Sequence, residues 1–494
     1  MISLKKNIKS NKNNFIFKII SFLLLITSII SCGLLIYFEI LPIMYLSLFI
    51  IIGGLIVFFF FKILNNKRLK KWIKIVISIP SILLIILFTF ISIYSYGTIS
   101  FFSEILDIGI RNDSYSIYVL NSSKYKNIKE LEDKVIAISD INDKGTEKAI
   151  DKISKKIEFN MAEYDSIGDS ANSLIEGEVD AILALDSNIE ILKEDTKEFN
   201  KLKSIYTFNV STKVETVGDK VDVSKKNFVF YISGIDTSGK VGAKARSDVN
   251  ILVAVNPKEN KILMVNTPRD YYVKLHDKKS MDKLTHAGVY GIEESVNTLE
   301  DLYDININYY ARVNFTTFVN IVEELDGINV NVPLSFCEQT SSRTSTKQIC
   351  LQKGEQTLNG EEALALSRTR HTVAGGDRGR IENQMLVLEA IIDKAISPKI
   401  ITKYNSLLNS VSDSIITNID QKSITKLIKK QIKNNSSWDI ETYSVTGTDA
   451  SDVTYSTGNG QVYVMKQDKE SVLEAKKLLD KILETNKYTE EVKK

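Results

Sequence analysis

The chain has 494 residues, which is enough for two or three domains that each bury a hydrophobic core. Its 63 basic and 61 acidic residues leave a net charge of +2, so bulk attraction to nucleic acid is not indicated. The composition averages two unlike parts, because the N-terminal part is strongly apolar and the rest is polar and charged.

Three apolar runs near the N-terminus are each long enough to cross a bilayer, which takes roughly 20 residues. They lie at about Ile19–Phe38, Ile43–Phe61 and Ile75–Tyr94. The alternative is a cleaved signal peptide followed by buried core helices. A signal peptide, however, has one short apolar region and a small-residue cleavage site. The three successive long runs therefore predict three transmembrane helices.

Basic residues beside these runs predict their orientation, because positively charged connectors stay in the cytoplasm. The N-terminus carries lysines from Lys5 to Lys12, and the second connector, Lys62–Lys74, carries six basic residues. The first connector, Glu39–Pro42, carries none. We therefore expect residues 1–97 to form a cytoplasmic N-terminus and three spans of the cell membrane. Everything after about Gly97 is then extracellular.

Residues 98–215 alternate strand-like and helix-like segments, which predicts a small extracellular α/β accessory domain. The expected strands are Ser116–Leu120, Val135–Ser139 and Val179–Leu185, and the expected helices are Thr146–Ile157 and Ser170–Glu176. The stretch SLIEGEVDAILAL looks like part of a periplasmic-binding-protein lobe. The domain has no His and no Cys, and its acids are scattered among lysines as on a solvated face. We expect it to carry no chemistry of its own.

A polar stretch at 211–226 follows, in which we place a linker at 216–226, and a second α/β domain is expected over residues 227–485. Its expected strands are Phe228–Ile232, Val249–Val255, Ile262–Asn266, Ile328–Val332, Trp438–Val445 and Gln461–Val464. Its expected helices are Glu293–Tyr303, Phe315–Leu325, Glu361–Ser367, Gln384–Ile396 and Ser471–Leu483. Residues 398–494 show no linker-like break, so we assign them to the same fold, with a disordered tail at 486–494.

Two of the three cysteines, Cys337 and Cys350, flank a polar stretch rich in Ser and Thr, while Cys32 lies in the first apolar run. An extracellular compartment permits disulfides. We therefore predict a Cys337–Cys350 bridge, and two unrelated thiols are the alternative.

Arginine is concentrated in one window of a chain that otherwise uses lysine. Only ten of the 63 basic residues are Arg, and eight of them lie between Arg246 and Arg380. The stretch LSRTRHTVAGGDRGRIENQ, residues 366–384, holds four. A solvated basic surface, the alternative, would be expected to use lysine here as well. Arginine is preferred where a planar fork must bind phosphate oxygens, so the window predicts a phosphate site.

Within this window, spacing favours particular residues. In an extended segment Arg368 and Arg370 would share one face, and on a helix Arg380 and Gln384 would share another. The AGGD segment between the pairs has glycines that allow close approach of the backbone to a ligand, and Asp377 is placed to cap the following helix. The N-terminus of that helix is itself suited to an anion.

Candidate metal ligands lie at the ends of predicted strands. GIDTSG (234–239) follows one strand and ARSDVN (245–250) leads into the next, so Asp236 and Asp248 are expected to lie close together. Two carboxylates of this kind suit Mg²⁺, which prefers oxygen ligands and takes one or two carboxylates plus phosphate oxygens and water. Singly, Asp236 is explained as a turn former and Asp248 as a cap. Arg246 between them favours the site.

Further basic residues are expected on the same rim. TPRD (267–270) follows a strand and brings Arg269, and KLTHAGVYG (283–291) brings Lys283 and His286. A hydrogen-bonded structural role is the alternative for His286. Other chemistries fit poorly, since the sequence lacks HExxH, zinc-ligand spacing, a GxSxG elbow and a Walker A loop. We also find no DNA-reading helix and expect no nucleic-acid partner.

These residues resemble a known family. GID-x(9)-RSD, TPRD, KLTHA, and SRTRH followed by GDxGRIENQ are similar to motifs of the LytR-CpsA-Psr family of bacterial envelope enzymes, over about Asn227 to Leu483. The resemblance implies a three-layer α/β/α catalytic domain. The three-span anchor and accessory domain are similar to those of members linked to capsule attachment.

The resemblance also implies an activity. A glycopolymer, such as teichoic acid or capsule, would be moved from a polyprenyl pyrophosphate to peptidoglycan, with the prenyl tail in an apolar tunnel between sheet and helices. Asp236 and Asp248 would position Mg²⁺ (or Mn²⁺), with Asp236 or Asp248 as proton acceptor. The phosphate oxygens would be held by Arg246, Arg269, Arg368, Arg370, Arg380 and Gln384, with Lys283 and Asp377 in motif positions nearby.

Two alternatives stay open: a polyprenyl-pyrophosphate hydrolase with water as acceptor, and a non-catalytic envelope regulator that binds lipid phosphates. One departure from the family is visible. Members often have a further arginine just before the motif glutamine, where this chain has Asn383, while Arg378 has no motif role.

Overall fold

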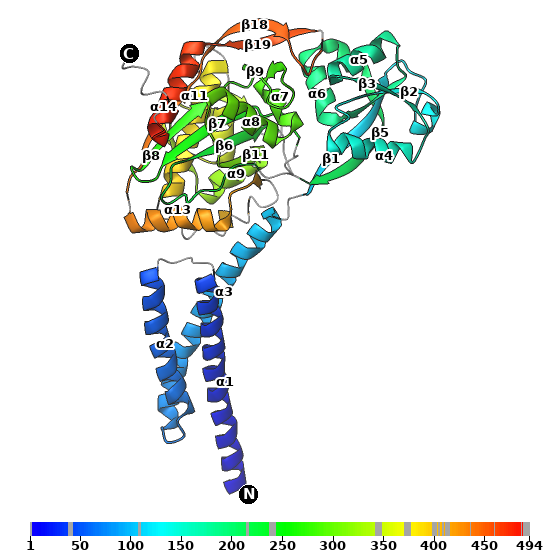
Figure 1. Cartoon of the computed structure of the whole chain (residues 1–494). Coiled ribbons are helices and arrows are strands. Elements are labelled where there is room, and N and C mark those ends of the chain that lie inside the picture. Colours follow the sequence, from blue (N-terminus) through cyan, green and yellow to red (C-terminus); the bar gives the residue numbers. More distant parts are fainter. Residues whose placement is uncertain are drawn as a thin grey trace. The chain divides into compact units, whose positions relative to one another are not determined.

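The computed structural model describes most of the chain (Figure 1). The described residues are 2–37, 43–106, 110–213, 217–236, 244–340, 348–369, 377–397, 415–434, 436–458, 460–485 and the single positions 403, 406, 407, 410 and 487. Two compact units are formed. One consists of Met1–Glu104, Ile401–Asn409 and Asp420–Asn435, and the other of Ile105–Ile400, Ser410–Ile419 and Ser436–Lys494.

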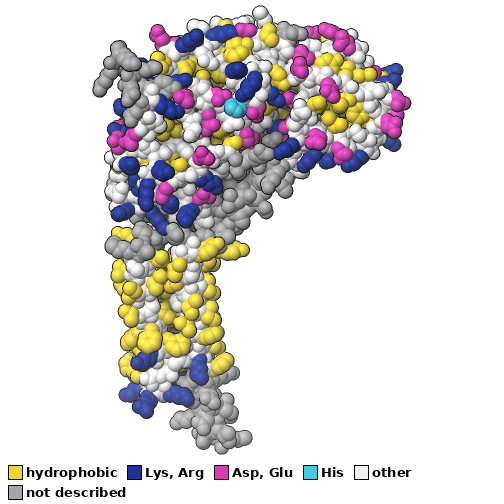
Figure 2. Space-filling model, in the orientation of Figure 1, with side chains coloured by type: hydrophobic (Ala, Val, Ile, Leu, Met, Phe, Trp, Pro, Cys, Tyr) yellow, Lys and Arg dark blue, Asp and Glu magenta, His cyan; other side chains and the backbone are white. Residues whose placement is uncertain are grey.

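The first unit contains three long helices, α1 (Ile2–Tyr37), α2 (Ile43–Asn65) and α3 (Lys71–Leu106). Each includes a segment apolar and long enough to span a membrane: Phe15–Tyr37, Tyr45–Asn65 and Lys71–Ile93. Figure 2 shows hydrophobic side chains over their outer surface, as expected for helices that face lipid. The three predicted transmembrane helices are thus present, and α3 continues beyond Gly97 to Leu106.

Contacts among the three helices use small polar groups and a few apolar side chains. Leu24, Val57 and Phe88, one from each helix, form a common buried cluster. The Asn65 amide donates a hydrogen bond of 2.9 Å to the Ser21 hydroxyl, which joins α2 to α1. Such interhelical hydrogen bonds stabilise helix association where the surrounding lipid offers no polar partner.

The first unit also includes α13 (Gln421–Asn434), an amphipathic helix with lysines on one face. The sequence assigned residues 398–494 as a whole to the second α/β fold. In the structure, α13 belongs to the same compact unit as the membrane helices.

The second unit begins with the accessory domain. Its strands are β1 (Ile110–Leu120), β2 (Val135–Ser139), β3 (Asn160–Tyr164), β4 (Ala181–Leu185) and β5 (Leu202–Lys213). Its helices are η1 (Ile128–Leu131), α4 (Lys144–Ser154), α5 (Ile167–Glu176), α6 (Asp186–Asp195) and η2 (Lys197–Lys201). The sheet order is β3-β2-β4-β1-β5, with β2 parallel to β3 and β4, and β1 antiparallel to its neighbours.

Both faces of this sheet are buried. Ile117 and Ile138 pack with α4 on one face, and Tyr118 and Ala137 pack with α5 and α6 on the other. This alternation follows from the two-residue period of strands, which sends successive side chains to opposite faces. The apolar runs of β2 and β4 read as buried strands for this reason.

The C-terminal domain contains the following strands and helices. Its strands are β6 (Phe228–Ile235), β7 (Val249–Asn256), β8 (Lys261–Asn266), β9 (Tyr272–Lys274), β10 (Met281–Lys283), β11 (Tyr309–Asn314), β12 (Ile328–Val332), β13 (Phe336–Gln339), β14 (Gln348–Leu351), β15 (Gly354–Leu358), β16 (Ile415–Thr417), β17 (Asp439–Ser444), β18 (Gly447–Val453) and β19 (Gln461–Gln467). Its helices are α7 (Leu284–Tyr290), α8 (Ile292–Tyr303), α9 (Phe315–Glu324), α10 (Gly360–Arg368), α11 (Asp377–Ile396) and α14 (Lys469–Leu483).

The central sheet of this domain has the order β16-β11-β6-β7-β8-β17. Val229 and Tyr231 of β6 and Leu252 of β7 face α7, α8 and α14 in the largest buried cluster. The intervening residues of these strands, such as Ile232 of β6 and Ile251 of β7, point to the opposite face of the sheet, toward α9, α10 and α11. The domain is therefore a three-layer α/β/α structure, as predicted (Figure 1).

Candidate functional site

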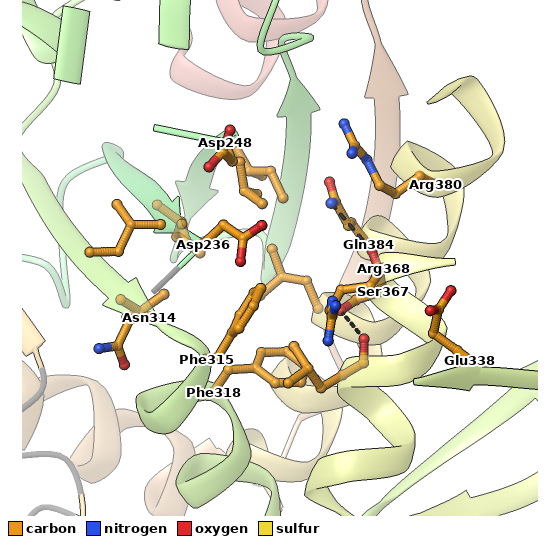
Figure 3. A pocket seen from close by; sticks show the side chains of 18 residues that line it. Asp236, Asp248, Asn314, Phe315, Phe318, Glu338, Ser367, Arg368, Arg380 and Gln384 are labelled. Atoms are coloured by element: carbon orange, nitrogen blue, oxygen red, sulfur yellow. Dashed lines mark hydrogen bonds between the residues drawn. The ribbon is translucent and has the colours of Figure 1, made fainter. Parts of the chain in front are cut away.

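A cavity of about 360 Å³ lies between the central sheet and helices α9, α10 and α11. Its walls are mostly apolar, and its polar groups come from strand ends and from α10 and α11 (Figure 3). The apolar lining consists of Ile232, Gly234, Ile235, Val249, Ile251, Val313, Phe315, Phe318, Leu364 and Leu388. The polar lining consists of Asp236, Asp248, Asn314, Glu338, Ser367, Arg368, Arg380 and Gln384.

Asp236 and Asp248 line this cavity together, as the sequence predicted, because β6 and β7 are antiparallel neighbours. Gly234 pairs with Val249 at the end of the ladder. A Cβ at Gly234 would lie 2.8 Å from the Val249 Cβ, so glycine allows the two strands their close approach here. The backbone N–H of Asp248 donates to the Gly234 carbonyl at 2.8 Å, which fixes the start of β7.

Arg368 is the last residue of α10, a helix that begins with a capping box between Asn359 and Glu362. The Arg368 guanidinium carbon lies 5.1 Å from the centre of the Phe315 ring, within range of a cation–π contact. A cation at a helix C-terminus is also favourable for the helix dipole. The helix ends at Arg368, and the following Thr369 is extended. Arg370 lies outside the described residues.

Arg380 and Gln384 both line the cavity from α11, which agrees with their spacing of four residues. The Gln384 side chain donates to the Ser367 carbonyl at 3.4 Å and so joins α11 to the end of α10 (Figure 3). Asn383 is buried, with 1% exposure, and is not among the described residues of the cavity wall. The side chains of Asp377 and Arg378 lie outside the described part of the chain.

Arg246, Arg269 and Lys283 do not line the cavity among the described residues. Arg269 adjoins it, because its Nη1 lies 2.8 Å from Oδ1 of Asp248. Arg246 forms an ion pair with Glu194 of the accessory domain. Lys283 is buried and its Nζ lies 2.6 Å from Asp195, also of the accessory domain. The predicted phosphate residues thus form two groups, one in the cavity wall and one beside it.

His286 has the structural role that the sequence left as an alternative. Its Nδ1 lies 2.7 Å from Oδ1 of Asp282, and both side chains are buried. The other carboxylate oxygen of Asp282 accepts hydrogen bonds from the backbone and hydroxyl of Ser456.

Two residues near the site were missed in the sequence. Arg312 on β11 is fully buried and donates to the hydroxyls of Ser233 and Ser247 and to the carbonyl of Gly288. It therefore holds the segment that carries Asp248. In the sequence it is a single arginine inside an apolar run, with no motif beside it. The second, Glu338, is part of the cavity wall and follows Cys337 directly.

The predicted disulfide is formed between Cys337 and Cys350. The two cysteines face each other across the hairpin of β13 and β14. Since Glu338 lies on β13, the bridge anchors a strand that contributes to the cavity wall.

Comparison with known proteins extends these observations. Residues 186–480 match the profile of the LytR_cpsA_psr family. The polyisoprenyl-teichoic acid–peptidoglycan teichoic acid transferase TagT of Bacillus subtilis (strain 168) is 36% identical over 262 residues, which cover 52% of this chain and 77% of TagT. TagV of the same strain is 37% identical over 46% of this chain and 59% of TagV.

Similar proteins are found beyond Bacillus and among solved structures. The teichoic acid transferase TagU of Enterococcus faecalis is 32% identical over 44% of this chain and 74% of TagU. The crystal structure of B. subtilis TagV aligns with a TM-score of 0.45 and 33% identity, over 53% of this chain and 98% of that chain.

Proposed function

Because the chain belongs to the LytR-CpsA-Psr family, we propose that it transfers an anionic glycopolymer from a polyprenyl-pyrophosphate carrier to peptidoglycan. The observation that carries this proposal is the cavity between the sheet and α9–α11. One cavity combines an apolar lining with arginine and aspartate side chains, which suits the apolar tail and the anionic head of a prenyl pyrophosphate. The similar proteins named as teichoic acid transferases support a polymer of the teichoic acid class.

The binding mode follows from the lining. The prenyl tail would lie against Ile232, Ile251, Val313 and Phe318, where its burial is favourable by about 25 cal/mol per Å² of apolar surface. The pyrophosphate would lie at the mouth, where guanidinium groups bind phosphate oxygens in bidentate geometry.

The reaction requires positioning and charge neutralisation more than covalent help from the protein. A peptidoglycan sugar hydroxyl would attack the sugar-linked phosphorus, the bridging P–O bond would break, and polyprenyl phosphate would leave. Arg368, Arg380 and Gln384 would bind the oxygens on which charge develops. The hydroxyl proton would pass to a carboxylate oxygen of Asp236 or Asp248.

The same two aspartates are the residues suited to hold Mg²⁺ or Mn²⁺. No group of three or more potential His, Cys, Asp or Glu ligands occurs among the described residues. Two carboxylates on one cavity wall nevertheless fit a cation that completes its shell with phosphate oxygens and water. Bound there, the cation would neutralise charge on the phosphate oxygens.

We also propose that the second unit, apart from its junction to α3, lies on the outer side of the cell membrane. Two features of the sequence support this. The N-terminus and the α2–α3 connector are rich in Lys and Arg, and three spans then bring the rest of the chain outside. This orientation would place the cavity on the side where peptidoglycan is built, beside its lipid-linked substrate.

A deletion strain tests the function in cells. Complementation with the wild-type gene should restore wall-bound polymer, whereas Arg368→Ala should leave the polymer shed into the medium. Arg378→Ala, at a position without a motif role, is the matched control and should behave as the wild type. Equal wall-bound polymer with Arg368→Ala and wild type would contradict the proposal.

A further inference from the structure

The last turn of α6 in the accessory domain meets basic groups of the C-terminal domain. The Glu194 carboxylate pairs with Arg246, and its Oε1 lies 3.6 Å from Nη2 of Arg269. The adjacent Asp195 lies 2.6 Å from Nζ of Lys283 and 3.5 Å from Nε2 of His286. Two consecutive acids therefore face four basic side chains of the other domain.

The position of these acids is unfavourable for α6 itself. The C-terminus of a helix carries partial negative charge, so Glu and Asp in the last turn are destabilising there. The ion pairs that Glu194 and Asp195 form with basic side chains of the C-terminal domain offset this unfavourable position. The local conflict thus points to a role at the interface between the two domains.

The two contacts differ in exposure, which gives them different roles. Asp195 and Lys283 are largely buried, with side-chain exposures of 12% and 5%, and breaking a buried pair is costly. Glu194 is 44% exposed and Arg246 is 25% exposed, so water and small anions reach this pair. Exposed pairs are worth little and exchange readily. The Asp195–Lys283 pair therefore holds the two domains together, whereas another anion can take the place of the Glu194 carboxylate beside Arg246.

Arg269 connects Glu194 to the cavity. One of its amino groups lies against Asp248 in the cavity wall, and the other faces Glu194. A carboxylate and a phosphate accept hydrogen bonds from the same guanidinium N–H groups. Glu194 therefore takes up donors that a phosphate oxygen at the mouth of the cavity would use, and adds negative charge beside an anionic substrate.

We propose that the accessory domain regulates substrate binding, with the Glu194 carboxylate competing against the substrate pyrophosphate for Arg246 and Arg269. This proposal rests on the proposed function, because it takes the two arginines as phosphate ligands. Binding of the pyrophosphate displaces Glu194, and the Asp195–Lys283 pair keeps the accessory domain in place meanwhile.

Titration calorimetry of the full-length protein in detergent, with geranyl pyrophosphate as the probe, tests the competition. Glu194→Gln removes the charge but keeps the side-chain shape. Because one exposed ion pair is worth up to about 1 kcal/mol and a tenfold change in Kd is about 1.4 kcal/mol, we expect binding to become tighter by up to about fivefold. Prenyl pyrophosphate cleavage should show a lower KM with kcat unchanged.

Glu190→Gln is the matched control, since Glu190 is exposed and lies one turn earlier on the same helix. It should bind as the wild type does. In an Arg246→Gln background, the gain from Glu194→Gln should shrink. Binding by Glu194→Gln that equals or falls below the wild type would overturn the competition.

Failure of this proposal is distinguishable from failure of the proposed function. Polymer transfer that depends on Arg368, without tighter binding by Glu194→Gln, overturns the competition alone. Tighter binding without transfer of polymer supports the competition and contradicts the transferase.

Discussion

In the cavity wall, the guanidinium of Arg368 makes a cation–π contact with the Phe315 ring, at 5.1 Å from the ring centre. Lysine cannot replace this group, because an ammonium is a point charge without the planar fork. At Arg368, the need for a planar guanidinium explains why a chain that otherwise uses lysine has arginine here. Arg246 and Arg269 form ion pairs with the carboxylates of Glu194 and Asp248.

Substitutions of Arg368 can separate the effect of its positive charge from the effect of its planar guanidinium geometry. Arg368→Ala should lower kcat for prenyl pyrophosphate cleavage by about 10²–10³, the usual cost of losing one donor to a developing oxyanion. Arg368→Lys should recover only part of this loss, since it restores the charge without the bidentate geometry. Steady-state kinetics of the purified protein measure both. Full activity of Arg368→Lys would show that charge alone is required.

Residues of the site were predictable where strand ends or motifs marked them. Asp236 was predicted from the end of one apolar strand and Asp248 from the polar segment that leads into the next, while Arg380 and Gln384 were predicted from helical spacing. The contact between Glu194 and Arg246 was not predictable, because the accessory domain scatters its acids among lysines. Only the meeting of two domains distinguishes Glu194 from a solvated acid.

At the scale of elements, several apolar strands were located well, whereas the buried strand β11 and polar strands such as β3 were missed. Val135–Ser139 and Ile328–Val332 were predicted with the bounds that β2 and β12 have. Strand β3, with the sequence NMAEY, has no buried residue and no apolar run. It is held by its parallel pairing with β2, which local sequence does not reveal. Likewise, β5 extends to Lys213 into the polar stretch at 211–226, because it pairs with β1 along its length.

Helix α8 contains a buried acid that makes stability depend on pH. Burial raises the pKa of Glu294 to about 7 from its usual value of 4.5, helped by its hydrogen bond with the Asp277 side chain. The folded chain therefore binds this proton more tightly than the unfolded chain does. The resulting stabilisation is fully present below pH 4.5 and is lost as the pH rises through 7.

The loss amounts to roughly 3 kcal/mol, since one pKa unit corresponds to about 1.4 kcal/mol. Glu294→Gln should remove this dependence, because the amide stays neutral. Thermal unfolding between pH 4.5 and 7.5 should show the wild-type Tm falling relative to that of Glu294→Gln. An exposed acid, Glu178→Gln, should follow the wild type. Parallel Tm curves for wild type and Glu294→Gln would contradict the assignment.

At the scale of the whole molecule, composition alone separated the apolar N-terminal part from the rest. The three apolar runs form three helices whose apolar segments are close to the predicted spans. The prediction was accurate because a run of about 20 apolar residues is typical of a helix that crosses a membrane. The inclusion of α13 in the unit of the membrane helices was not predicted. This unit joins segments that lie more than three hundred residues apart in the chain, which local sequence does not reveal.

The central claim is polymer transfer, and the most direct measurement follows the phosphorus atom that links sugar to carrier. The purified protein would be incubated with peptidoglycan and a polyprenyl-pyrophosphate glycopolymer labelled at the sugar-linked phosphorus. Transfer predicts the label in a phosphodiester on peptidoglycan, with polyprenyl monophosphate released, and no such product from Arg368→Ala. Label found only on free polymer would identify hydrolysis and contradict the account, as would label retained on the lipid.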